Sequence, residues 1–102
     1  MYIPTPAIQA KHVLHKAQTE DYIEWAMTML EVGLESNNLQ ILSGLSKFAS
    51  PFEAEYYFNK AKLELGISEP TKEQAVKDYA IYIAQQILDD IILYKQGVES
   101  LA

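Results

Sequence analysis

Apolar residues recur along the chain at intervals of three and four, the spacing of helices that bury one face. No stretch alternates apolar and polar residues with the period of two that a half-buried strand requires, so no strand is predicted. Short polar breaks separate the periodic segments, as in helical bundles. The predicted helices cover residues 5–17, 19–33, 36–45, 50–66 and 71–96.

The helix boundaries are predicted from capping residues. Each start has a hydroxyl side chain that can accept a hydrogen bond from N–H groups of the first turn. One start also has Pro51 in its first turn and Glu53 at the position that completes a capping box. Glycine is expected to end three helices, because it readily adopts the left-handed conformation. The starts are Thr5, Thr19, Ser36, Ser50 and Thr71, and the glycine stops are Gly33, Gly66 and Gly97.

These elements predict an all-α fold class in a single domain over residues 1–102. The architecture is either an irregular five-helix bundle or a stack of helical hairpins, with a long C-terminal helix. Residues 30–34 match residues 63–67 at an offset of 33, a period typical of helix-pair repeats. A helix that ends in glycine followed by an apolar residue has the same local pattern, so a shared end motif also explains the match.

Composition narrows the possible functions. Fourteen acids and eight bases give a net charge of −6, and all eight bases are lysine. Nucleic-acid binding is disfavoured because arginine is absent and the lysines are scattered. The lack of cysteine excludes a disulfide scaffold, a cysteine-ligated zinc site and a thiol nucleophile. We expect a cytoplasmic protein without membrane contact, because neither a signal peptide nor a sufficiently long apolar run is present.

The predicted helix 19–33 has acids on one arc and apolar residues on the other. From Glu20 to Ser46 the chain has five acids and no base. This pattern predicts a docking surface for a basic protein partner. The alternative is a solvated face that only keeps an acidic protein soluble. The acids are Glu20, Asp21, Glu24, Glu31 and Glu35.

The predicted helix 50–66 has apolar residues on two sides. Phe52, Tyr56 and Leu63 lie away from the main core stripe, and exposed aromatic residues are typical of protein interfaces. We therefore add Phe52 and Tyr56 to the candidate partner-binding residues. The alternative is that they pack against the loop around Phe48 or against the first helix.

The predicted helix 71–96 is apolar around most of its circumference, so it is either central in the bundle or shared with a second chain. A homodimer through this helix is one expectation. A row of polar residues on the same helix suggests either a ligand pocket with Asp90 as general base or a buried ladder that fixes register. The row consists of Tyr82, Gln86, Asp90 and Tyr94.

The two histidines, His12 and His15, lie three residues apart on the first predicted helix. Histidines at this spacing can share a metal ion, but Lys11 and Lys16 are adjacent and that helix contains no acid. We expect an ordinary, partly exposed pair. No catalytic residue, metal site or cofactor is predicted.

The stretch 21–66 resembles a pattern of small, uncharacterised bacterial all-helical proteins that have no family name. The resemblance covers less than half of the chain. It implies a helical fold and a bacterial source, and it includes no catalytic motif. The matching residues are Trp25, Ala26, Leu30, Gly33, Ser36, the run 39–45, Phe52, Glu53, Tyr57, Phe58, Leu65 and Gly66.

Together these observations predict a small, acidic, non-catalytic protein–protein interaction module. An inhibitor that neutralises a basic protein, as bacterial immunity proteins do, fits this description. One alternative is a small-molecule-binding protein or an enzyme with a polar pocket around Asp90. Another is a purely structural module that binds only further copies of itself.

Overall fold

The computed structural model describes the backbone of residues 3–101 and the side chains of residues 3–95. Within this range all regular secondary structure is helical, which confirms the predicted all-α fold with its long last helix. The helices are α1 (Thr5–Val13), α2 (Thr19–Glu31), α3 (Asn37–Ser43), α4 (Pro51–Leu65) and α5 (Lys72–Leu101). None of these helices is both long and apolar enough to cross a membrane.

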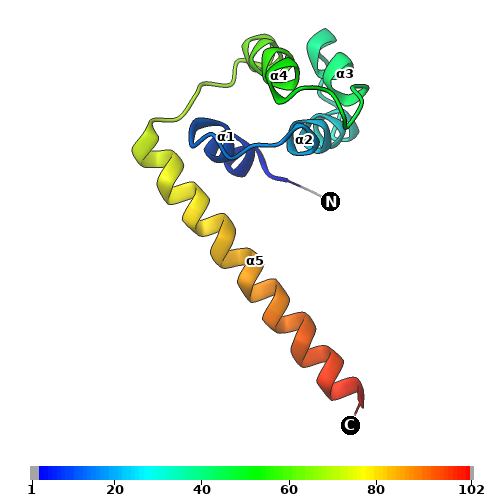
Figure 1. Cartoon of the computed structure of the whole chain (residues 1–102), viewed down its shortest axis with the longest axis vertical. Helices are drawn as coiled ribbons and strands as arrows, with labels where there is room; N and C mark the ends of the chain where they lie inside the picture. Colours follow the sequence, from blue (N-terminus) through cyan, green and yellow to red (C-terminus); the bar gives the residue numbers. More distant parts are fainter. Residues whose placement is uncertain (1–2, 102) are drawn as a thin grey trace.

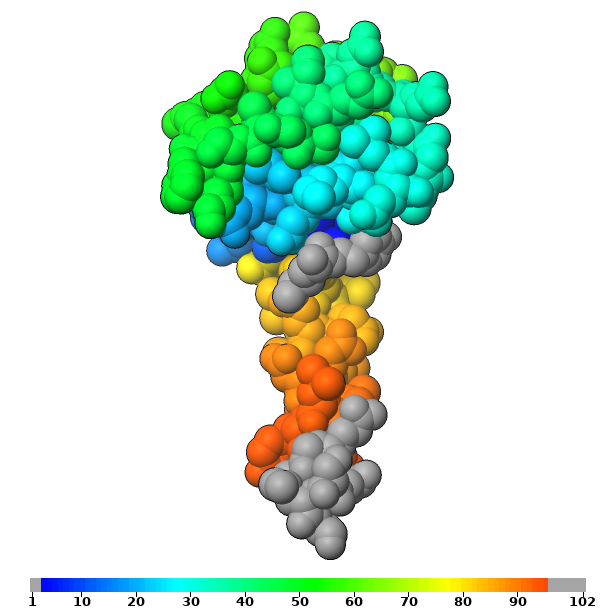
Figure 2. Space-filling model, turned by 90° about the vertical axis from the view of Figure 1, so that its right-hand side faces the viewer, coloured from blue at the N-terminus to red at the C-terminus, as the bar shows by residue number. Residues whose placement is uncertain are grey.

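Helices α1–α4 pack together, whereas α5 extends away from them over most of its length (Figure 1). Within the described part of the chain, α2 packs against all three other short helices, and α5 packs against α1 alone. Every side chain from residue 84 to residue 95 is exposed. We call α1–α4 the head and residues 84–101 the arm; the described side chains of the arm form the orange part of the narrow projection in Figure 2.

The core of the head is centred on Trp25 of α2 and Phe58 of α4, which are both fully buried. Their ring centroids lie 5.0 Å apart in an edge-to-face arrangement, a favourable geometry for aromatic rings. The indole N–H of Trp25 donates to the Thr5 hydroxyl at 2.9 Å, which ties the start of α1 to α2. The largest fully buried side chains are Ile8, Trp25, Leu39, Leu42 and Phe58.

Three of the predicted hydroxyl caps are present. The hydroxyl oxygens of Ser36, Ser50 and Thr71 accept hydrogen bonds from backbone N–H groups in the first turns of α3, α4 and α5. Glu64 of α4 strengthens the start of α3, because its carboxylate accepts hydrogen bonds from Ser36 and Asn38. These hydrogen bonds stabilise the ionised carboxylate and lower the pKa of Glu64.

Glycine ends α2 and α4 as predicted. Gly33 and Gly66 have positive φ angles of 94° and 69°. In both places the apolar residue after the glycine returns a hydrogen bond to the last turn, from Leu34 N to Met29 O at 3.1 Å and from Ile67 N to Lys62 O at 2.9 Å. This is the Schellman arrangement, and the shared end motif accounts for the sequence match at an offset of 33.

The first helix is shorter than predicted and ends at Val13, before Ala17. His15 has a positive φ of 57°, and the N–H of Lys16 donates to the carbonyl of Lys11 at 2.7 Å. The chain therefore makes a Schellman end without glycine. Histidine in a left-handed conformation is uncommon, so the sequence pattern did not indicate this stop.

Further boundaries differ from the prediction. Pro4 rather than Thr5 is the cap residue of α1, and α3 ends at Ser43, before Leu45. Gln18, rather than Thr19, caps α2: the backbone N–H of Gln18 donates to the carboxylate of Asp21 at 2.9 Å. Thr19 is instead buried and donates its hydroxyl to the Ala49 carbonyl. At the other end of the chain α5 continues through Gly97 to Leu101, so this glycine does not end the helix.

Candidate functional site

The five acids predicted to form one surface differ in their surroundings. Asp21 is partly buried, because its carboxylate accepts the Gln18 N–H and lies 3.4 Å from the ammonium group of Lys11. Glu24 is also partly buried. Glu20, Glu31 and Glu35 are exposed, so these three acids are free to meet a partner.

The second face of α4 is open to solvent. Phe52, Tyr56 and Leu63 are 82, 55 and 82% exposed. They lie on the side opposite the buried residues Ala54 and Phe58, so one face of the helix packs in the core and the other presents an apolar stripe. Phe48, the residue expected to cover this stripe in the alternative interpretation, is itself 86% exposed.

The start of α2 lies beside the segment that leads into α4. The Thr19 hydroxyl donates to the Ala49 carbonyl at 2.9 Å, so Glu20 lies at the same end of the head as the exposed Phe48 and Phe52. Two lysines accompany the aromatic side chains: Lys47 lies over the ring of Phe48 and Lys60 over that of Tyr56. We call this region the docking surface; it consists of Glu20, Phe48, Phe52, Glu53 and Tyr56.

Three of the four predicted pocket residues line a common groove. Tyr82, Gln86 and Asp90 face Pro4 across an open space of about 560 Å³. The side-chain amide of Gln86 donates to the Tyr82 hydroxyl at 2.8 Å. Asp90 is exposed, so water solvates its carboxylate. Tyr94 is 75% exposed and lies outside the lining of the groove.

A polar cluster lies at the junction of α1, α2, α4 and the segment before α5, where the buried Tyr22 and Lys62 meet Glu55 and Glu69, whose side chains are 43 and 57% exposed. His12 of α1 is at its centre, with a side chain only 9% exposed. One ring nitrogen, Nδ1, lies 3.0 Å from the Tyr22 hydroxyl, and the other, Nε2, lies 3.0 Å from a Glu69 carboxylate oxygen. A second carboxylate, that of Glu55, lies 3.9 Å from Nδ1. As a whole residue His12 is partly exposed, as expected, but its side chain is largely covered, whereas His15 is exposed.

The neutral form of His12 satisfies both close partners. Its Nε2–H group donates to the Glu69 carboxylate, and its Nδ1 atom accepts from the Tyr22 hydroxyl. Burial, assisted by the nearby ammonium group of Lys62, lowers the pKa of His12 below its ordinary value. Burial also raises the pKa of the Tyr22 hydroxyl, so that hydroxyl stays protonated. The cluster therefore holds a neutral imidazole.

Lys62 extends the cluster along α4. Its ammonium group donates to the side-chain oxygen of Gln9 at 3.0 Å, lies 3.6 Å from Glu69, and rests over the Phe58 ring. The Gln9 amide in turn donates to the Ser68 carbonyl at 2.8 Å. These contacts fasten α1 and α4 to the segment before α5. Burial lowers the pKa of Lys62, and the neighbouring Glu69 partly offsets that effect.

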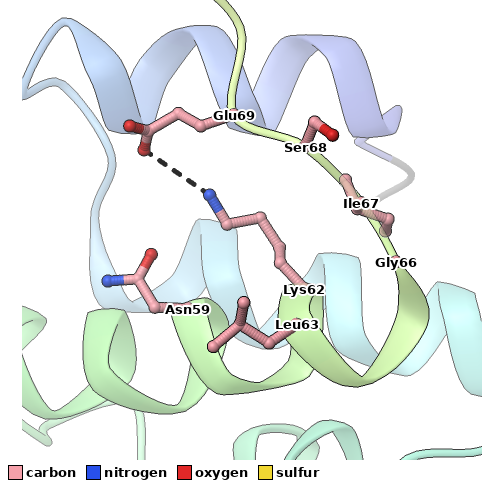
Figure 3. A pocket seen from close by; sticks show the side chains of 7 residues that line it. All are labelled: Asn59, Lys62, Leu63, Gly66, Ile67, Ser68 and Glu69. Carbon is pink, nitrogen blue, oxygen red and sulfur yellow. Dashed lines mark ion pairs between the residues drawn. The ribbon is translucent and has the colours of Figure 1, made fainter.

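An open hollow lies beside Lys62, between the end of α4 and the segment that follows it (Figure 3). The ammonium group of Lys62 points across the hollow to Glu69 (Figure 3). An anion entering the hollow would compete with the carboxylate of Glu69 for the same cation. This arrangement therefore favours a structural role for the Lys62–Glu69 pair over a ligand site.

The cluster has the order carboxylate, imidazole, hydroxyl that proton relays use. However, the Tyr22 side chain at its inner end is only 3% exposed, so a substrate has no access to that hydroxyl. Its remaining polar groups bond to one another. Among the described residues no group of three or more histidine, aspartate or glutamate side chains could hold a metal ion.

Sequence reasoning missed this cluster because its members are far apart along the chain. His12 and Lys62 lie on different helices, and Glu69 lies between helices. Spacing along one helix carries no information about such partners. No protein-family model, curated protein or solved structure matches the chain.

Proposed function

We propose that this protein is a non-catalytic interaction module whose head binds a basic protein through the docking surface. The observation that carries the proposal is the open face of α4, where Phe52 is 82% exposed and Tyr56 is 55% exposed, beside Phe48 at 86%. Contiguous exposed apolar side chains on a small domain typically mark an interaction site. Aromatic side chains are also the commonest anchors of protein interfaces.

The net charge of the chain favours a basic partner, although Lys47 and Lys60 lie against aromatic rings of the docking surface. The chain has a net charge of −6, and Glu20, Glu31 and Glu35 are exposed on or just after α2. Complementary charge accelerates encounter and orients the two surfaces, while the aromatic anchors supply most of the affinity. A basic surface with an apolar pocket for Phe52 satisfies both requirements.

The rigidity of the head supports the same function. Trp25 and Phe58 are fully buried behind the docking surface, and the His12 cluster ties α1, α2 and α4 together. A surface that is held in place before binding loses less conformational entropy when a partner docks. The internal pairing of the polar cluster also favours a binding role over a catalytic one.

The experiment that tests this proposal compares four baits in a native cell extract. The first is the intact protein, the second carries Glu20→Gln with Glu31→Gln, and the third carries Phe52→Ser with Tyr56→Ser. The matched control carries Asp89→Asn with Asp90→Asn, which removes two exposed charges from the arm. Circular dichroism confirms that each bait is folded.

We expect the intact bait and the arm control to capture the same basic protein. The Phe52/Tyr56 variant should bind it at least about tenfold more weakly, because anchors of this kind contribute 2 kcal/mol or more. The Glu20/Glu31 variant should associate more slowly and respond less to salt. Equal binding by all four baits, measured with the purified partner, would contradict the proposal.

A further inference from the structure

Along α5 an acid and a base lie at equal distances on either side of one small residue. Glu73, Ala84 and Lys95 are spaced eleven residues apart, and all three are exposed. Eleven residues are almost three full helical turns, so the three side chains lie along one line of the helix. An acid therefore lies on one side of Ala84 and a base lies at an equal distance on the other.

This line runs down the middle of an apolar face that points away from the head. The side of α5 that contacts α1 includes the fully buried Ala75, which lies half a turn around the helix from Ala84. Around the line, the apolar side chains between 76 and 92 are half exposed or more. They are Val76 at 52%, Ile81 at 67%, Ile87 at 55%, Leu88 at 52%, Ile91 at 50% and Ile92 at 51%.

In the arm the opposite side of the helix is mostly polar. Gln86, Asp89 and Asp90 continue the side that contacts α1 and line the open groove beside Pro4. From residue 76 to residue 92 the apolar face is therefore exposed to solvent, and in the described part of the arm the polar side continues the side that faces the head. An occupant of the apolar face would approach from the side opposite α1 and would meet no part of its own head there.

We propose that the occupant is a second copy of this chain, whose α5 lies antiparallel to the first and crosses it at Ala84. In this register residue numbers in contact sum to 168, so Ile81 lies against the partner copy's position 87 and Ala80 against position 88. Ala84 faces itself across the two-fold axis. Its small side chain allows the two helices to approach closely.

The charged residues favour the antiparallel direction and the register centred on Ala84. In the antiparallel arrangement each Glu73 carboxylate lies next to the partner copy's position 95, so the interface is closed at both ends by an acid–lysine pair. A parallel pair would place Glu73 against its own copy and Lys95 against its own copy, which is destabilising. Within one chain Glu73 already lies 3.8 Å from Lys77, whose aliphatic stem can cover the apolar contact at position 91.

The available area is sufficient for a specific dimer. From Glu73 to Lys95 the helix is about 33 Å long, and half of its circumference presents roughly 550 Å². Two such faces together exceed the roughly 1,000 Å² that a specific interface needs. The inference does not depend on the proposed function, because the docking surface lies on the head and stays exposed in this dimer.

The test uses the absence of cysteine from the chain, since one introduced thiol is then unique. Sedimentation of the intact protein should show a monomer–dimer equilibrium that shifts with concentration. Under mild oxidation Ala84→Cys should form covalent dimers. Glu73→Cys and Lys95→Cys should each form no covalent dimer alone and should form a mixed covalent dimer when combined. Gln86→Cys, on the polar side of the helix, is the matched control and should not cross-link.

Charge reversal provides a second readout that needs no oxidation. Glu73→Lys alone and Lys95→Glu alone should each weaken the dimer by about three- to tenfold, the effect expected of two exposed ion pairs. The double variant should restore the original affinity. A protein that stays monomeric at every concentration, or Glu73→Cys that cross-links alone, would overturn the inference. So would a dimer that none of the α5 thiols traps, and none of these results changes the binding of a basic partner by the head.

Discussion

The head and the arm contain similar apolar side chains but differ in what covers them. In the head, Trp25 and Phe58 are fully buried by neighbouring helices. In the arm, Ile87 and Ile91 are at least half exposed. The comparison shows that an apolar face is enough to predict a helix. Burial of that face also requires a second surface that packs against it. In the head this surface comes from the same chain.

The largest expected difference between the two regions concerns aromatic side chains. Trp25→Ala should destabilise the protein by about 3–5 kcal/mol, because it removes a fully buried ring and leaves a cavity. Tyr94→Ala should change the free energy of unfolding by less than about 0.5 kcal/mol, because Tyr94 is 75% exposed. Urea unfolding followed by circular dichroism measures both. Similar losses in the two variants would show that the arm is part of the folded core.

A second comparison uses one substitution at two glutamines. Gln9→Ala should cost roughly 1–3 kcal/mol, because the ammonium group of Lys62 loses a buried acceptor and the Ser68 carbonyl loses its donor. Gln85→Ala removes only an exposed hydrogen bond to Asp89 and should cost less than about 0.5 kcal/mol. The same unfolding measurement applies. An unchanged Gln9→Ala variant would show that the polar cluster does not stabilise the head.

Two glycines should respond with opposite signs. Gly33 has a φ of 94°, so Gly33→Ala should destabilise the head by roughly 1–2 kcal/mol although no atom lies within 4 Å of the added methyl group. Gly97 is inside α5, and Gly97→Ala should favour the local helix by up to about 1 kcal/mol. Urea midpoints report the first change, and the helical circular dichroism signal reports the second. A destabilised Gly97→Ala variant would argue against helix at that position.

The smallest expected effect is the pH dependence that His12 gives the head. Its lowered pKa means that, below the ordinary value of 6.5, the unfolded chain binds a proton that the folded chain resists. The free energy of unfolding should therefore decrease as pH falls through 6.5, until the lowered pKa is reached. His12→Asn should remove this part of the pH dependence. Urea midpoints on both sides of pH 6.5 measure it, and an opposite slope would mean that Glu69 and Glu55 outweigh burial.

Local features of the fold were predictable from the sequence. Ser36, Ser50 and Thr71 cap their helices through hydrogen bonds to the adjacent turn, and Gly33 ends α2, because such motifs involve only neighbouring residues. The end of α1 was not predictable, since His15 takes the position that glycine normally occupies. The position of the long helix, away from the head, was also not predictable. The periodicity of apolar residues does not show which elements cover a helix face.

The candidate sites also divide into features that one helix determines and features that depend on contacts between elements. The exposure of Phe52 and Tyr56 follows from helical periodicity, because Phe58 on the opposite side fills the core. The pairing of Asp21 with Lys11 and that of His12 with Glu69 join residues of different elements. Those pairs depend on how the helices cross, and the sequence of one helix does not specify its crossing with another.

Among the described residues α5 packs against α1 and no other helix, so the long helix is held near one end. At 1.5 Å per residue, its thirty residues span about 45 Å, and most of that length lies beyond its contact with α1. A small rotation at α1 therefore becomes a displacement of several ångströms at the far end. The segment before α5 is fastened to α1 by the Gln9–Ser68 hydrogen bond and by the contact of His12 with Glu69, so these bonds hold the near end of the long helix in place.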